Sequence, residues 1–219
     1  MRATRRSLKS VSRSIAVSSL RARRTQAERS SEAQSILIDV AIQQIREKGL
    51  AYVTMAEIAD QAGMTRGAIQ HHFGSRDDYM RAVSTTLTDR VATILDDQPP
   101  ANKGAPEQVV RRCIESLGRI ILSRDQLAVT DISISSRSVP QLLADSERMS
   151  IRMRDMYASA WRRWLGDHYS SAGIEKGFLI FSTMYSGMLV INYGKSEPEN
   201  YETMLALCAE LVENVLISP

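Results

Sequence analysis

The stretch TMAEIADQAGMTRGAIQHHF, residues 54–73, decides the fold of this 219-residue chain. Ala59, Gly63 and Ile69 stand in it with the spacing A-x3-G-x5-I. A small residue lets two helices cross closely, a glycine adopts the positive φ of a tight turn, and an aliphatic side chain on the second helix packs back onto the first. The spacing therefore predicts a helix–turn–helix.

Capping residues set the expected bounds of the two short helices. Thr54 with Glu57 three residues later forms a capping box, so the first helix begins there and ends at Gly63. We expect Thr65 to cap the second helix, which continues through Phe73.

Longer helices flank this unit. The preceding one starts near Ser30, carries an apolar face and ends at Lys48 and Gly49. Its apolar face is formed by Ala33, Ile36, Leu37, Val40, Ala41 and Ile45. The following one opens at a second capping box, Ser75 with Asp78.

The rest of the chain also has helical periodicity. DDQPPANKGAP, residues 96–106, is a linker, and further helices follow it, the last starting around Ser196, Pro198 and Glu199. We expect an all-α fold of about nine helices, divided by this linker into a helical unit over 34–94, which follows a basic arm over 1–30, and a second helical unit over 100–219.

The charge is concentrated at the N-terminus. The net charge is +3, yet residues 1–27 hold eight Lys or Arg and no acid. Three interpretations stay open for this tail: a basic or inert disordered arm, a wrongly assigned start codon, or a targeting segment. Basicity alone therefore gives weak support for nucleic-acid binding, and the argument depends on local placement.

Several function classes find no support in the sequence. No apolar run reaches the roughly 18–20 residues of a membrane span. Cys113 and Cys208 lack CxxC spacing, so we expect reduced, buried thiols in a cytosolic protein, with neither zinc nor disulfide. Adjacent His71 and His72 point about 100° apart on a helix and cannot converge on one metal. Nucleotide-binding, zincin and hydrolase motifs are absent, so we expect no enzyme, no catalytic residue, no metal and no cofactor.

The second short helix has an exposed face suited to DNA. Arg pairs with guanine, Gln pairs with adenine, and His donates to a base edge or a phosphate, while a glycine allows close approach. Ile69 and Phe73 point to the core, and the opposite face is formed by Arg66, Gly67, Gln70 and His71. Arg76 and Thr54, each at a helix start, suit phosphate contacts.

These residues carry a resemblance. The segment GLAYVTMAEIADQAGMTRGAIQHHFGSRDDYMRAV is similar to the DNA-binding domain of the TetR family of bacterial transcriptional regulators. The resemblance covers roughly residues 34–94 and implies a homodimer with an N-terminal DNA reader and a C-terminal domain that binds a small molecule and pairs subunits through its last two long helices. By position it implies DNA contacts at Thr54, Arg66, Gly67, Gln70, His71, His72 and Arg76.

One residue departs from the family pattern. The family usually has tyrosine where this chain has Gln70, and that tyrosine typically donates its hydroxyl to a phosphate. Gln70 is shorter and carries both a donor and an acceptor. Two hypotheses follow: a weakened phosphate contact, or a residue that reads a base. For His72 we expect a packing or phosphate role.

The C-terminal half offers fewer signals. A Met and aromatic stripe runs along the helix after Pro140, and most such stripes are core. Within the family one or two members of such a stripe often touch ligand, which makes Met153, Tyr157 and Trp161 candidates. The helix over 173–193 is apolar nearly all round, so we expect it to be covered on every side, with Ser182, Ser186 and Gly187 at a dimer seam.

The leading hypothesis is a cytoplasmic bacterial repressor, nucleoid-associated when bound to double-stranded DNA and without contact with a membrane. It binds a palindromic operator as a homodimer and is released by a small-molecule effector whose identity the sequence does not give. An alternative is a sequence-tolerant, DNA-compacting protein driven by the basic tail. A third is a helical small-molecule carrier, against which the exposed positions of Arg66 and Arg76 argue.

Overall fold

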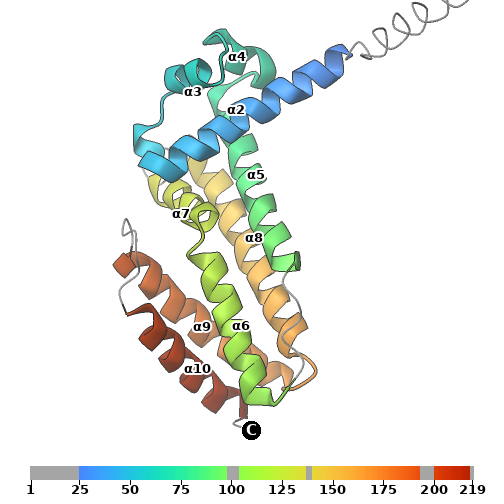
Figure 1. Ribbon diagram of the computed structural model, residues 1–219, viewed down its shortest axis with the longest axis vertical. Coiled ribbons are helices and arrows are strands. Elements are labelled where there is room, and N and C mark those ends of the chain that lie inside the picture. The colour runs from blue at the N-terminus through green and yellow to red at the C-terminus, as the bar shows by residue number, and fades with distance from the viewer. Residues whose placement is uncertain (1–24, 98–103, 137–139, 193–199, 218–219) are drawn as a thin grey trace, which may run out of the picture.

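The computed structural model describes residues 25–97, 104–136, 140–192 and 200–217. This part of the chain contains only helices, as predicted (Figure 1). The elements are α2 (Gln26–Lys48), η1 (Leu50–Tyr52), α3 (Met55–Gln61), α4 (Gly67–Phe73), α5 (Arg76–Asp97), α6 (Pro106–Ile121), α7 (Arg124–Ser136), α8 (Pro140–Leu165), α9 (Ser171–Asn192) and α10 (Tyr201–Ile217). The tail before Thr25, the centre of the expected linker (98–103) and the expected start of the last helix (196–199) lie outside the described residues.

Helix α2 begins earlier than the sequence pattern predicts. Thr25 and Glu28 form a complete capping box, so the helix starts at Gln26 rather than near Ser30. It ends at Gly49, whose φ of +82° suits a glycine. The predicted apolar face is buried at its centre, but Ile36 is 40% exposed because it lies at the edge of that face.

Helix α5 connects the two ends of the molecule. In Figure 1, α3 and α4 lie at one end, α9 and α10 lie at the other, and α5 runs from α4 toward the second group. Tyr79 at its start is buried and donates a 2.6 Å hydrogen bond to the carbonyl of Leu37 on α2. The ring of Phe73 on α4 lies 4.8 Å from that of Tyr79. One buried aromatic residue therefore joins α2, α4 and α5.

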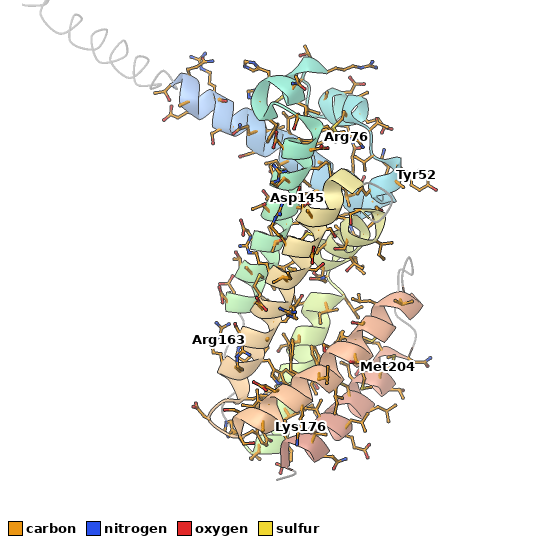
Figure 2. The ribbon with its side chains drawn as sticks, turned by 180° about the vertical axis from the view of Figure 1, so that it is seen from behind. Tyr52, Arg76, Asp145, Arg163, Lys176 and Met204 are labelled. Atoms are coloured by element: carbon orange, nitrogen blue, oxygen red, sulfur yellow. The ribbon has the colours of Figure 1, made fainter. Side chains whose placement is uncertain are left out.

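Charged side chains join α5 to α8 along their length. Asp145 of α8 accepts two hydrogen bonds from Arg81 at the α4 end of α5. Arg152 pairs with Asp89 at 2.5 Å, and the guanidinium of Arg163 pairs with Asp96 at 3.2 Å. Residue numbers rise together in these pairs, so the two helices run parallel. Figure 2 shows Asp145 and Arg163 at separate heights along the molecule.

Helix α7 contacts the other end of α2. Arg46 pairs with Asp125, and the backbone N–H of Leu50 donates to the carboxylate of Asp131. The loop after α2 is thereby held by an acid of the C-terminal half. This arrangement couples the end of the molecule that holds α3 and α4 to the rest of the chain.

Helices α9 and α10 pack closely and antiparallel. A Cβ at Gly173 would lie 3.2 Å from the carbonyl oxygen of Leu216, and one at Gly177 would lie 3.4 Å from the Val212 side chain. The expectation that 173–193 is covered on every side is wrong for the single chain. Leu179 and Val190 are 67% and 76% exposed, because no helix among the described residues packs against that face.

Both cysteines, Cys113 and Cys208, are free and buried, as the lack of paired spacing predicts. Among the described residues, no helix combines the length and apolarity that a membrane crossing requires.

Candidate nucleic-acid interface

The predicted turn is present between α3 and α4. Thr54 accepts a hydrogen bond from the backbone of Glu57, whose side chain reaches back to the Thr54 backbone, so the predicted capping box is confirmed. Gly63 has a φ of +65°, and Ala59 and Ile69 are buried where the two helices meet. The three spaced residues therefore serve the packing roles that their spacing predicts.

The predicted cap of α4 is wrong. Arg66, in a helical conformation, occupies the N-cap position and forms no side-chain capping hydrogen bond. Thr65 is not the N-cap, because the helix begins one residue later than expected. The residues before it form a turn in which the N–H of Ala68 donates to the Thr65 carbonyl. The first N–H groups of α4 thus have no capping side chain.

The outer face of α4 is open. Arg66, Gly67, Gln70 and His71 are all exposed, as predicted, whereas Ile69 is buried. A Cβ added at Gly67 would meet only the Thr65 hydroxyl, 4.0 Å away. Internal packing therefore does not require a glycine there. Its small size is useful only to a partner that approaches from outside.

His72 points away from this face, toward α2. It is half-buried; its Nδ1 lies 3.3 Å from the Ser30 hydroxyl, and its carbonyl accepts a 2.8 Å hydrogen bond from the Gln34 side chain. The His71 and His72 rings meet edge to face, with their centroids 5.0 Å apart. This placement favours packing over DNA contact for His72. The sequence pattern missed Ser30 and Gln34, because they lie about 40 residues away.

Gln70 is engaged with its own helix. Its side-chain N–H donates to the carbonyl of Gly74, just beyond the end of α4. The Gln70 carbonyl oxygen remains an acceptor, and the second N–H of its amide group remains a donor. Neither sequence hypothesis for Gln70 anticipated this local hydrogen bond.

Two arginines flank α4 without an acidic partner. Within the described part of the chain, the exposed guanidiniums of Arg66 and Arg76 form no ion pair. Arg46, Arg81 and Arg90 of the same region are each paired with an aspartate. Figure 2 labels Arg76 at the α4 end of the molecule. Unpaired cations on one surface are available to phosphates or bases.

Thr54 is exposed at the start of α3, but its hydroxyl also donates to the Glu57 carboxylate at 2.9 Å. Lys48 approaches the same carboxylate at 3.0 Å. The hydrogen bond from Lys48, followed by that from Thr54, lowers the pKa of Glu57. Glu57 therefore stays ionised and holds the cap in place.

The ligand candidates of α8 lie in the core. The Tyr157 hydroxyl donates to the Gln126 side chain at 2.9 Å, and the Trp161 indole N–H donates to the Ile174 carbonyl at 3.0 Å. Trp161 also lines a cavity of about 390 Å³ between α8 and α9, together with Phe178. Met153 is buried, and neither it nor Tyr157 lines that cavity.

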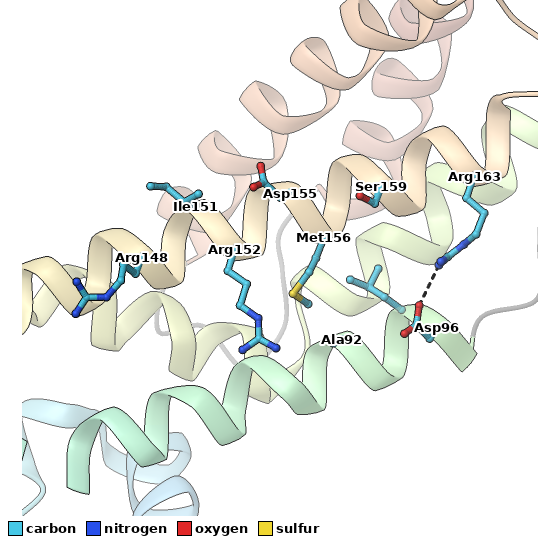
Figure 3. Close-up of a pocket in the computed structure, with 10 residues that line it drawn as sticks. Ala92, Asp96, Arg148, Ile151, Arg152, Asp155, Met156, Ser159 and Arg163 are labelled. Atoms are coloured by element: carbon cyan, nitrogen blue, oxygen red, sulfur yellow. Dashed lines mark hydrogen bonds and ion pairs between the residues drawn. The ribbon is translucent and has the colours of Figure 1, made fainter. Parts of the chain in front are cut away.

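A larger groove lies between α5 and α8 (Figure 3). Its volume is about 530 Å³, within the range of small-molecule sites. Ala92, Leu95, Ile151 and Met156 supply apolar surface, and the Arg163–Asp96 ion pair crosses it. The sequence pattern missed this groove, because it depends on two helices some 60 residues apart.

Among the described residues, no group of three or more His, Cys, Asp or Glu side chains is arranged to hold a metal ion.

Comparison with known proteins agrees with this geometry. The model of the family described as bacterial regulatory proteins, tetR family, matches residues 37–83. The HTH-type transcriptional regulator CymR of Pseudomonas putida is 27% identical over 186 residues, which cover 82% of this chain and 89% of CymR.

Solved structures share the fold. A transcriptional regulator from Rhodococcus sp. Rha1 superposes with a TM-score of 0.65 at 19% identity, covering 85% of this chain and 99% of that one. The multidrug binding protein EbrR, complexed with proflavin, has a TM-score of 0.56 at 16% identity, with 84% and 99% covered. The tetR family model therefore matches the helix–turn–helix itself, and the chain is similar along most of its length to a bacterial HTH-type transcriptional regulator.

Proposed function

We propose that this regulator is a repressor that binds a palindromic operator as a homodimer and is released by a small-molecule effector. The observation that carries the DNA-reading part is the outer face of α4. Arg66, Gly67 and His71 are exposed there, and Arg66 has no acidic partner among the described residues. The opposite face of α4 is held in place by buried Ile69 and by the hydrogen bonds between α2 and His72. A rigid helix with a free cation and a close-approach glycine suits the major groove.

The proposed dimer forms through α9 and α10. Their outer faces carry exposed apolar side chains at helical spacing, namely Leu179 and Val190 on α9 and Leu207 and Leu211 on α10. Small or polar residues lie between them on α9, and no atom of a non-neighbouring described residue lies within 4 Å of a Cβ built at Gly187. A second copy of the same chain is the natural occupant, since a two-fold contact pairs one patch with itself. Such a dimer would place two copies of α4 about 34 Å apart, in successive major grooves.

The effector is proposed to bind beside α5. The α5–α8 groove is lined in part by α5, and α4 packs against α5. A small molecule in the groove that favours one position of α5 therefore also favours one position of α4. The smaller cavity beside Trp161 is the second candidate. The proflavin complex of EbrR shows that a protein of this fold accepts an aromatic ligand.

A mobility-shift assay tests the DNA-reading assignment. Overlapping duplexes from the region upstream of the chain's own gene are the probes, and Arg66→Ala, His71→Ala and Arg76→Ala are the variants. We expect Arg66→Ala and His71→Ala to weaken binding and to relax sequence preference by about 1–3 kcal/mol per base contact. Arg76→Ala should weaken all duplexes alike and reduce the salt slope by about one.

Arg124→Ala is the matched control, because Arg124 is exposed on α7, outside the helix–turn–helix. If neither Arg66→Ala nor His71→Ala weakens binding, the assignment is wrong. Removal of residues 1–24 distinguishes this proposal from the alternative of a sequence-tolerant DNA-binding protein. A sequence-tolerant protein driven by its tail would be favoured if the truncated chain lost nearly all affinity for DNA and the full chain showed no preference for a palindrome.

A further inference from the structure

Four sulfur-bearing side chains meet between α9 and α10. Met184 and Met188 stand four residues apart on α9, and Met204 and Cys208 stand four residues apart on α10. Residues four apart share one face of a helix. All four line a single small cavity, which is completed by Tyr185 and Leu205.

The packing of the two helices determines which residues face each other. Gly173 lies against Leu216 and Gly177 against Val212. Continued along the antiparallel pair, this register brings residues 181–188 of α9 alongside residues 201–208 of α10, the two segments that hold all four side chains. Each helix thus contributes two sulfur atoms to one site from opposite sides.

Ordinary core filling accounts poorly for this concentration. Methionine does fill irregular gaps in protein cores. However, the chain has only ten methionines and two cysteines in 219 residues, and four of the six residues that line this cavity come from those twelve. A gap-filling role also predicts a closed gap, whereas a cavity of about 10 Å³ remains.

The size and lining of the cavity select its occupant. A volume near 10 Å³ accommodates one small particle, about the size of a single water molecule. A buried water needs two to four polar partners, whereas the side chains of this lining offer one hydroxyl, that of Tyr185, beside sulfur and hydrocarbon. Thioether and thiol sulfurs are soft ligands that select copper(I). The lining has no carboxylate or imidazole to attract a harder ion.

The ligands also offer a path inward. Met184 and Met204 are half-buried, whereas Met188 and Cys208 are each only 2% exposed. An ion can therefore meet two flexible thioethers near the surface before it reaches the buried thiol. Figure 2 labels Met204 on the α9–α10 side of the molecule, far from the DNA-reading end.

We propose that Met184, Met188, Met204 and Cys208 form a binding site for one soft monovalent metal ion of the copper(I) class. Burial raises the pKa of the Cys208 thiol to about 11, so the thiol is protonated at neutral pH. Binding replaces this proton: the S–H bond breaks, a sulfur–copper bond forms, and one proton leaves to solvent with no change of oxidation state.

The site has a regulatory position that goes beyond the proposed effector groove. Leu207 adjoins Cys208 on α10, and its side chain points outward on the proposed dimer face. An ion held between α9 and α10 would fix the separation of the two helices that carry this face. Metal occupancy would then favour one dimer geometry over another.

The test is a titration of the full chain with copper(I), supplied under reducing, oxygen-free conditions and in competition with the colorimetric chelator bathocuproine disulfonate. Cys113→Ser serves as the background, so that Cys208 is the only thiol. We expect one ion per chain and release of one proton. In this background, the triple variant Met184→Leu, Met188→Leu, Met204→Leu should bind copper(I) much more weakly. Removal of a group that only supports a metal ligand costs about 10–100-fold in affinity, and we expect the triple variant to lose more than that.

Leucine conserves the volume of methionine, so the triple variant should remain folded. Met149→Leu with Met153→Leu, two buried methionines of α8, is the matched control and should bind normally. If the triple variant proves unstable in thermal unfolding, Met204→Leu alone replaces it, with an expected loss of at least about tenfold. Absence of copper(I) binding, or equal affinity in the folded variants and the control, overturns the proposal. Operator binding by the metal-free variants is expected to be normal, so this outcome does not bear on the DNA-reading assignment.

Discussion

The hydroxyl of Tyr79 on α5 and the carbonyl of Leu37 on α2 are joined by a buried 2.6 Å hydrogen bond. The same tyrosine ring packs against Phe73, the last residue of the recognition helix α4. Burial raises the pKa of Tyr79, so its hydroxyl keeps the proton that it donates. Tyr79 therefore links α4 to both α2 and α5.

Tyr79→Phe should lower the free energy of unfolding by about 1 kcal/mol, because it removes one buried hydrogen bond and keeps the ring contact with Phe73. Urea unfolding followed by circular dichroism measures the change. Tyr52→Phe is the control and should have no effect, because Tyr52 is 72% exposed. Equal stability of both variants would mean that the Tyr79 hydroxyl contributes little.

Gln70→Tyr should distinguish the two hypotheses for Gln70. The substitution removes the bond to the Gly74 carbonyl and supplies a phenolic hydroxyl that reaches further outward. A few-fold increase in affinity for every duplex tested would indicate a phosphate contact. A changed order of operator preference would instead show that Gln70 reads a base. Gln70→Ala is the control for loss of the Gly74 bond alone.

Leu207→Glu should convert the proposed dimer to a monomer. A carboxylate on the apolar face of α10 meets its own copy across a two-fold contact, where like charges are costly to bury. Light scattering measures the mass in solution. Ile134→Glu on α7 is the control, since Ile134 is equally exposed but lies outside α9 and α10. A dimer that survives Leu207→Glu would place the interface elsewhere.

Asp145 makes stability depend on acid pH. The hydrogen bond from Arg81 is the main cause that lowers the pKa of Asp145 below its ordinary value of about 3.9. The folded state therefore binds the proton less readily than the unfolded state, and this stabilisation is present at neutral pH and lost as pH falls below about 4. Asp145→Asn should cost about 0.5–1 kcal/mol at pH 7 and should flatten the loss of stability between about pH 4 and pH 2.

Urea unfolding at a series of pH values measures this effect. Asp60→Asn is the control, because Asp60 is exposed and forms no ion pair among the residues described. Parallel pH profiles for Asp145→Asn and the unaltered chain would contradict the prediction.

Local signals made much of the fold predictable. The capping box at Thr54, the turn at Gly63 and the burial of Ile69 each follow from chemistry within a few residues, and the structure has all three. The cap at Thr65 was predicted wrongly, because several residues near a tight turn can start a helix and sequence alone does not rank them.

The candidate site was only partly predictable. The exposed face of α4 follows from helical periodicity. The support for His72 from Ser30 and Gln34 does not, since it requires the crossing of α2 over α4. The α5–α8 groove and its ion pairs join residues more than 60 positions apart, and a single sequence does not show such long-range contacts.

Helix α5 runs without interruption for 22 residues from the recognition helix to the far end of the groove. At 1.5 Å per residue it is a rod about 33 Å long. A tilt of about 5° at one end displaces the other end by about 3 Å, close to the 3.4 Å step between successive bases. The Arg163–Asp96 ion pair joins α8 to the end of α5 that lies opposite α4, so a small change in the angle of α5 at that end is magnified along the rod into a shift of α4.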